Sequence, residues 1–438
     1  MARSRLLLHG DLILMAGATL AAVAMGVLVV AAPLVGGLSI AALGVVVAAV
    51  RLGPVAIGLP ALMLLPWFVV LEGVAPALIG TLVAAAAAGA LLLAVMPLRF
   101  DNAMVPAAAA AFVLVVVGHA IFAVDEEQFI QVAKYLVFVT IALAMSSAAA
   151  GELMPRLKVP LLASGFAAIL VHLGIVAAGL GNASSYYGVG ERLGYAADGP
   201  HALALLATIV AGAGLAMQRL TLQIPLFSLG VVTAMLTGVR SALLGIAVMI
   251  GLFLLSARSK SRAIGVLVAF AVVAVVTGAA DVVTSRFDRE AGEFASFSGA
   301  GSGRGLIWTV AIQGWEAAGP AAWFVGAGLQ SVVEFEVAAL GSGLVGHSDL
   351  VEILVNLGIV GLAAWLMLWI GLLRAGMSAL VLLPILIFGL VNGTLEYVAA
   401  VTFGLAVAAA CSSRPDDGES AGGQPAERAE PSRSASAL

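Results

Sequence analysis

Long apolar runs, separated by short clusters of charged residues, proline and glycine, recur along the 438-residue chain. A helix needs about 20 apolar residues to cross the hydrocarbon core of a bilayer. The runs predict helices over 12–32, 37–50, 53–72, 76–97, 104–124, 129–149, 159–180, 203–218, 223–239, 241–256, 263–281, 349–373, 377–393 and 397–411. Several are short and are either re-entrant or pair into fewer spans. We therefore expect an all-α, polytopic helical membrane protein with about 12–14 transmembrane helices.

The composition agrees with this pattern and excludes other classes of protein. Hydrophobic residues make up 62% of the chain and charged residues only 10%, whereas a soluble domain carries about 25% charged residues. A soluble enzyme and a disordered chain are therefore excluded, and a barrel would alternate apolar and polar residues. The net charge of −4 indicates no nucleic-acid partner. The single cysteine, Cys411, excludes an intrachain disulfide.

The lysine and arginine residues predict the orientation, because basic residues concentrate on the cytoplasmic side of membrane helices. When both termini are placed in the cytoplasm, most of the 20 basic residues fall inside, with Arg258, Lys260 and Arg262 as the strongest cluster. Lys134 falls within a span. Five basic residues stay on the outer, periplasmic face: Arg192, Arg240, Arg286, Arg289 and Arg304.

The spans and the segments between them predict four parts. These are an N-terminal transmembrane bundle (1–281), a large periplasmic loop (282–346), C-terminal transmembrane helices (347–411) and a disordered cytoplasmic tail (412–438). A loop this long is usually functional or disordered. It contains Trp308 among apolar stretches with helical spacing, so we expect one or two amphipathic helices on the membrane surface.

The outer arginines are the first candidates for a site. Arg240 interrupts an apolar run, and a guanidinium at that depth usually needs a partner or a ligand. It is either a snorkelling side chain paired with Asp198 or Glu352, or part of a clamp for phosphate or pyrophosphate together with Arg192 and Arg304.

Two histidines are expected at the same boundary. His347 precedes the span that begins at 349, and imidazole can accept a proton from a hydroxyl near neutral pH. His201 caps the next helix or lines the same site. Asp349 and Glu352, three residues apart on one helix face, either orient His347, pair with an arginine or cap the helix. No HExxH, P-loop or complete dinucleotide motif occurs, so no metal or cofactor is expected.

Four short segments in this order resemble the O-antigen ligase and O-antigen polymerase family. They are Thr-Gly-Val-Arg at 237–240, Arg-Gly-Leu-Ile-Trp at 304–308, Gly-Ala-Gly at 326–328, and the histidine segment 347–362. A fifth, at 192–201, is similar to an upstream family segment. The chain departs from the common pattern at Val239, Ser348 and His201, where many members have Ser, Asn and Asn.

The resemblance implies a metal-independent glycosyl transfer at the periplasmic face of the bacterial inner membrane. The donor would be a glycan on undecaprenyl diphosphate, and the acceptor a growing glycan or lipid A–core. By family analogy, Arg240 and Arg304 would bind the diphosphate, and His347 would take the proton from the acceptor hydroxyl. The alternatives are a transporter or flippase, which would place ionisable groups near the bilayer midplane, and a structural membrane protein.

Overall fold

The computed structural model describes residues 53–70, 77–100, 102–149, 153–177, 200–256, 259–278, 304–341 and 348–412. Within these ranges the chain is helical and contains no strand. The helices are α3 (Pro54–Val70), α4 (Ala77–Ala94), α5 (Met104–Ala120), α6 (Glu126–Ala149), α7 (Leu153–Ala177), α8 (His201–Leu215), α9 (Leu220–Thr237), α10 (Arg240–Ser256), α11 (Lys260–Val276), α13 (Arg304–Ala317), α14 (Pro320–Val325), α15 (Ser331–Leu340), α16 (Asp349–Arg374), α17 (Ala379–Asn392) and α18 (Val398–Ala410).

These helices confirm the all-α membrane fold expected from the apolar runs. Four of them, α6, α7, α9 and α16, are long and apolar enough to cross a membrane, and shorter apolar helices accompany them. Each expected span from 53–72 onward corresponds to one helix. The expected spans 12–32 and 37–50, and the tail beyond residue 412, lie outside the described residues.

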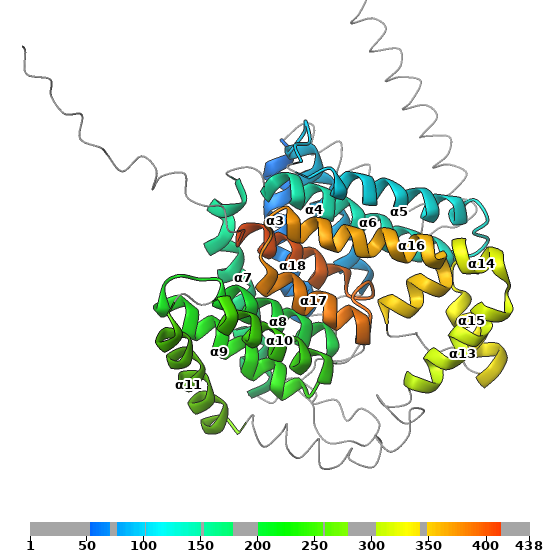
Figure 1. The fold of residues 1–438 in the computed structure, drawn as a ribbon. Helices are drawn as coiled ribbons and strands as arrows, with labels where there is room; N and C mark the ends of the chain where they lie inside the picture. The colour runs from blue at the N-terminus through cyan, green and yellow to red at the C-terminus, as the bar shows by residue number, and fades with distance from the viewer. Residues whose placement is uncertain are drawn as a thin grey trace, which may run out of the picture.

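Two helices rich in small residues form the centre of the bundle. In α8 every residue from Ala202 to Leu215 is buried, and α18 is buried almost throughout. Such helices let backbones approach closely: a side chain at Gly212 would collide with the Leu380 carbonyl of α17. Figure 1 shows α18 in the middle of the bundle and α11 at its edge.

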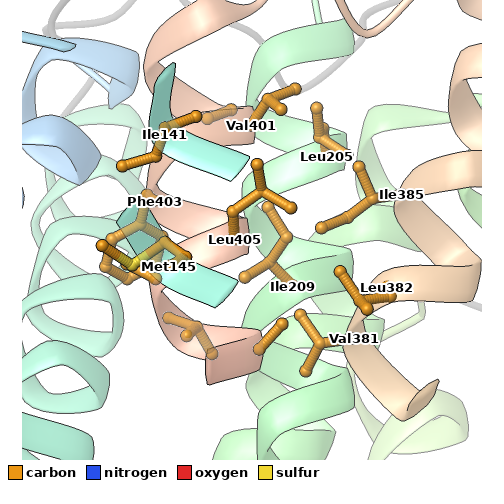
Figure 2. Packing of buried hydrophobic residues seen from close by; sticks show 14 of the residues in the cluster. Ile141, Met145, Leu205, Ile209, Val381, Leu382, Ile385, Val401, Phe403 and Leu405 are labelled. Carbon is orange, nitrogen blue, oxygen red and sulfur yellow. The ribbon is translucent and has the colours of Figure 1, made fainter. Parts of the chain in front are cut away.

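The central core joins helices that lie far apart in the sequence. Figure 2 shows side chains of α6, α8, α17 and α18 meeting there: Ile141, Met145, Leu205, Ile209, Val381, Leu382, Ile385, Val401, Phe403 and Leu405. The C-terminal helices therefore pack inside the same bundle as the N-terminal ones.

The part of the long loop that is described forms three helices, α13, α14 and α15, rather than one or two. They lie together beside one end of α16 (Figure 1). A small second core joins α13, α15 and α16 through Ala311, Val332, Val351 and Val355, with Trp308 packed against it. The loop helices are thus attached to the bundle by an apolar contact.

A break in α16 provides a second attachment for the loop helices. Gly358 has φ 69° and ψ −172°, which interrupts the helix. The interruption lets the backbone after α14 approach, and Ala327 N donates to Val355 O at 2.8 Å. A side chain at Gly358 would collide with the backbone of Phe324 and Gly326.

Replacing Gly358 should therefore be strongly destabilising. Gly358→Ala forces an L-residue into the left-handed region, which costs about 1–3 kcal/mol, and adds a collision with the loop backbone. We expect a clear drop in the thermal unfolding temperature of the purified protein. Gly251→Ala in α10 is the control, because a Cβ there meets no atom within 4 Å. Equal unfolding temperatures for the two variants would contradict this account of the break.

Candidate functional site

The short connection between α17 and α18 contacts several of the predicted site residues. We call residues 389–397 the α17–α18 turn. It contains the end of α17, the polar run Asn392-Gly-Thr-Leu-Glu396 and Tyr397. Its backbone and side chains bond to the first residues of α8, α10, α13 and α16, and to α6.

Asn392 connects two of the predicted segments. Its side chain is 1% exposed, and Nδ2 donates to His201 Nδ1 at 3.3 Å and to Ser241 Oγ. His201 is the first residue of α8, and Ser241 directly follows Arg240, the first residue of α10. Asn392 thereby fixes the starts of both helices against the turn.

Backbone carbonyls at the end of α17 hold two further segments. Arg304, the first residue of α13, donates from a terminal guanidinium nitrogen to Val391 O at 3.3 Å. Ser348 donates to Leu390 O at 2.7 Å, and its oxygen accepts from the third residue of α16. The last carbonyls of a helix have no partner within it, and here they bind the beginnings of α13 and α16.

Asp349 is buried against the turn rather than capping its helix. The cap of α16 is Ser348. The Asp349 carboxylate is 0% exposed and accepts from the Thr394 hydroxyl and from Leu395 N, the latter at 3.2 Å. A side chain at Gly389 would collide with this carboxylate. The glycine therefore leaves the space in which Asp349 binds.

Further carboxylates and one lysine lie on the same side of the turn. Lys134 Nζ of α6 lies 2.5 Å from Glu396 Oε2, and both side chains keep some exposure, 21% and 29%. Glu352 interacts electrostatically with Glu396, Asp349 and Lys134. This group, Lys134, Asp349, Glu352 and Glu396, holds three acidic side chains and one basic one. We refer to it as the carboxylate cluster.

Gln131 of α6 connects the carboxylate cluster to the loop helices. Its Nε2 donates to Glu352 Oε1 at 2.6 Å, and its Oε1 accepts from Gln330 N at 2.9 Å. The Tyr135 hydroxyl also donates to Glu352. Gln330 precedes α15 with φ 66°, so this bond holds a left-handed residue in place. One amide thus joins α6, α16 and α15.

The predicted residues fall into three groups. His201, Arg304 and Asp349 contact the α17–α18 turn, and so does Ser241, the residue that follows Arg240. Trp308 instead packs in the core between α13, α15 and α16. Arg192 and His347 lie outside the described residues.

The sequence reasoning missed Gln131, Asn392, Thr394 and Glu396. The available signal was the polar run at 392–396 between two apolar runs, together with Gln131 and Lys134 within a span. Polar residues at such places need partners inside the protein or a water-filled site. Their partners lie on other elements and could not be identified from the sequence.

In the described part of the chain, no group of three His, Cys, Asp or Glu side chains could hold a metal ion. A cavity of about 200 Å³ is lined by apolar side chains of α7 and α9 and by Met217. It lies at the opposite ends of α8 and α9 from His201 and Arg240, so it does not belong to the turn.

A family model matches part of the chain. Residues 225–366 match the family model described as O-antigen ligase, which confirms the resemblance seen in the sequence. The match contains Arg240, Arg304, His347 and Asp349, but neither His201 nor the α17–α18 turn. No curated protein matches the chain.

Gln131→Leu should destabilise the protein more than a similar change elsewhere in α6. The substitution leaves the buried Glu352 carboxylate and the Gln330 N–H without this partner. Each unsatisfied group lowers the free energy of unfolding by about 1–3 kcal/mol. Thr140→Val is the control, because the Thr140 hydroxyl only donates to Leu136 O within its own helix. Thermal unfolding of the purified variants measures the difference. A Gln131→Leu variant as stable as Thr140→Val would show that the bridge contributes nothing.

Proposed function

Because residues 225–366 resemble the O-antigen ligase family, we propose that this membrane protein is a glycosyltransferase of the O-antigen ligase or polymerase type. It would act at the periplasmic face of the bacterial inner membrane. The donor would be a glycan on undecaprenyl diphosphate, and the acceptor a hydroxyl of a growing glycan or of lipid A–core. The observation that carries this proposal is the gathering of His201, Arg304, Asp349 and the start of α10 at one turn.

In the proposed reaction the acceptor oxygen bonds to the anomeric carbon as the bond from that carbon to the diphosphate breaks. The acceptor's proton passes to His347. Negative charge grows on the leaving diphosphate, and fixed cations placed beforehand stabilise such charge most effectively. Arg240 and Arg304 would supply these cations, with Arg192 as a third.

The α17–α18 turn supports this proposal because its two sides differ in charge. Arg304, His201 and the start of α10 approach Val391 and Asn392. The carboxylate cluster lies around residues 394–396. An anionic diphosphate would be favoured on the first side and repelled by the second. The second side would suit neutral, hydroxyl-rich glycan, and Lys134 and Glu396 keep the exposure needed to contact it.

The helix ends at the turn agree with the predicted alternation of the spans, in which consecutive spans run in opposite directions. The starts of α6, α8, α10 and α16 and the end of α17 all belong to the predicted periplasmic side. Hydrogen bonds join them in one network at one end of the bundle. At the other end, Lys158 donates to Ala216 O, and Ser378 N donates to Ala408 O. These residues belong to the predicted cytoplasmic side.

Lys134 bears on the transporter alternative. It is the one basic residue predicted within a span, and a midplane charge would favour transport. Its partner, Glu396, lies in the turn between two helices. Lys134 therefore reaches the same helix ends as the proposed site, which favours the transferase.

His347→Ala tests the proposed base. Proton transfer by a positioned group typically contributes about 100-fold to 10,000-fold in rate. We expect normal membrane insertion, accumulation of lipid-linked glycan, and no polymer or ligated product. Product analysis also separates the two acceptors, since a ligase loads lipid A–core and a polymerase lengthens the lipid-linked chain. Full activity of the variant would remove His347 from the mechanism.

Arg240→Lys and Arg304→Lys test the proposed diphosphate contact. Lysine keeps the charge but lacks the planar fork of donors that matches phosphate oxygens. We expect each variant to lose roughly 100-fold to 1000-fold in turnover, the range for removing one transition-state donor. Arg289→Lys is the matched control, because Arg289 is predicted on the same face but outside the family-like segments. Equal activity of all three variants would contradict the role given to Arg240 and Arg304.

A further inference from the structure

A short apolar tip projects from the loop helices, outside the membrane spans. It is formed by Trp323, Phe324 and Val325 at the end of α14, which are 39%, 59% and 49% exposed. We call these three residues the α14 tip. The helix itself, Pro-Ala-Ala-Trp-Phe-Val, carries no charge. Adjacent exposed aromatic and aliphatic side chains are costly in water and usually mark an interaction surface.

The α14 tip continues an apolar surface of α5. His119, near the end of α5, donates from Nε2 to Val325 O at 2.5 Å. Leu114 of α5 is 73% exposed, and Phe122, just after the helix, is 78% exposed. The opposite face of α5 packs against α6 and α16. In a membrane protein the exposed side of such an apolar helix faces lipid, and the tip adjoins its outer end.

Several polar groups of the α14 tip have hydrogen-bond partners within the protein. Trp323 Nε1 donates to Glu316 O at 3.1 Å, and Gly326 N donates to Ala322 O at 2.8 Å. Val325 O is the acceptor for His119. Backbone and indole groups can enter an apolar environment only when they have such partners. These pairings lower the cost of bringing the tip into contact with hydrocarbon.

From this geometry we propose that the α14 tip inserts into the outer leaflet of the bilayer and anchors the loop helices there. The occupant of the surface is lipid, because the tip is uncharged, the Trp323 indole and the Val325 carbonyl have partners within the protein, and the tip continues the lipid-facing surface of α5. Aromatic residues such as Trp and Phe suit the boundary between hydrocarbon and headgroups. The anchor does not depend on the proposed transferase activity.

Spin labelling tests the anchor in the full-length protein. The single native cysteine is removed as Cys411→Ala, and one new cysteine is introduced as Phe324→Cys. Leu114→Cys is the reference for a lipid-facing site, and Glu316→Cys, exposed on α13, is the reference for a water-facing site. Each nitroxide-labelled protein is reconstituted into phosphatidylcholine vesicles. Its accessibility to oxygen, which partitions into lipid, and to a water-soluble nickel chelate is measured.

We expect the label at position 324 to be more accessible to oxygen than to the nickel chelate, as at position 114. At position 316 we expect the opposite order. A position 324 that behaves like 316 would place the tip in water and overturn the proposal. Low accessibility to both reagents would also overturn it, because protein, such as a second copy of the chain, would then cover the tip. All three sites are exposed, so the labels displace no core side chain.

Discussion

The arrangement of the loop helices depends on the break in α16. A membrane protein must satisfy its buried backbone groups internally, since hydrocarbon offers no hydrogen bonds. The break at Gly358 interrupts the regular hydrogen bonding of the preceding turn of α16. In that turn, Val355 O accepts from Ala327 N, and Asn356 O accepts from Gly328 N. The defect in one helix thus becomes the attachment point for the segment that follows α14. The bonds at the break add to two other attachments of α13, its apolar contact with α16 and the bond from Arg304 to Val391 O.

The buried carboxylates impose a second constraint on the same region. Burying a carboxylate is costly unless hydrogen bonds and opposite charge compensate it. Asp349 obtains its bonds from the α17–α18 turn, and Glu352 obtains its bonds from α6. Each acidic side chain thereby ties the start of α16 to a different element. Lys134 and Glu396 remain partly exposed. The buried carboxylates are therefore connected, through this ion pair, to a surface that a polar ligand can reach.

Much of the fold could be predicted from the sequence, because the bilayer imposes a length and a composition on every span. The helix boundaries were less predictable. The helix expected at 159–180 begins at Leu153, since Arg156 and Lys158 can remain helical while their charges reach water. The break at Gly358 was not predicted, because a glycine inside an apolar run is normally compatible with a helix. The role of Asn392 could not be predicted either, since it depends on α8 and α10 meeting α17 in space.

The rigidity of the bundle explains how a short turn can organise so many helix ends. α8 is buried along its length, and Gly212 and Gly230 allow α17 and α9 to approach it at backbone distance. The backbones therefore set the separation between these helices, with little contribution from flexible side chains. Side-chain bonds at the outer end, such as those of Asn392, can then act on helix starts that are already close to their final positions. Electrostatic stabilisation of a leaving group requires cations whose positions change little during reaction, and a core of closely packed small residues supplies that stiffness to the proposed site.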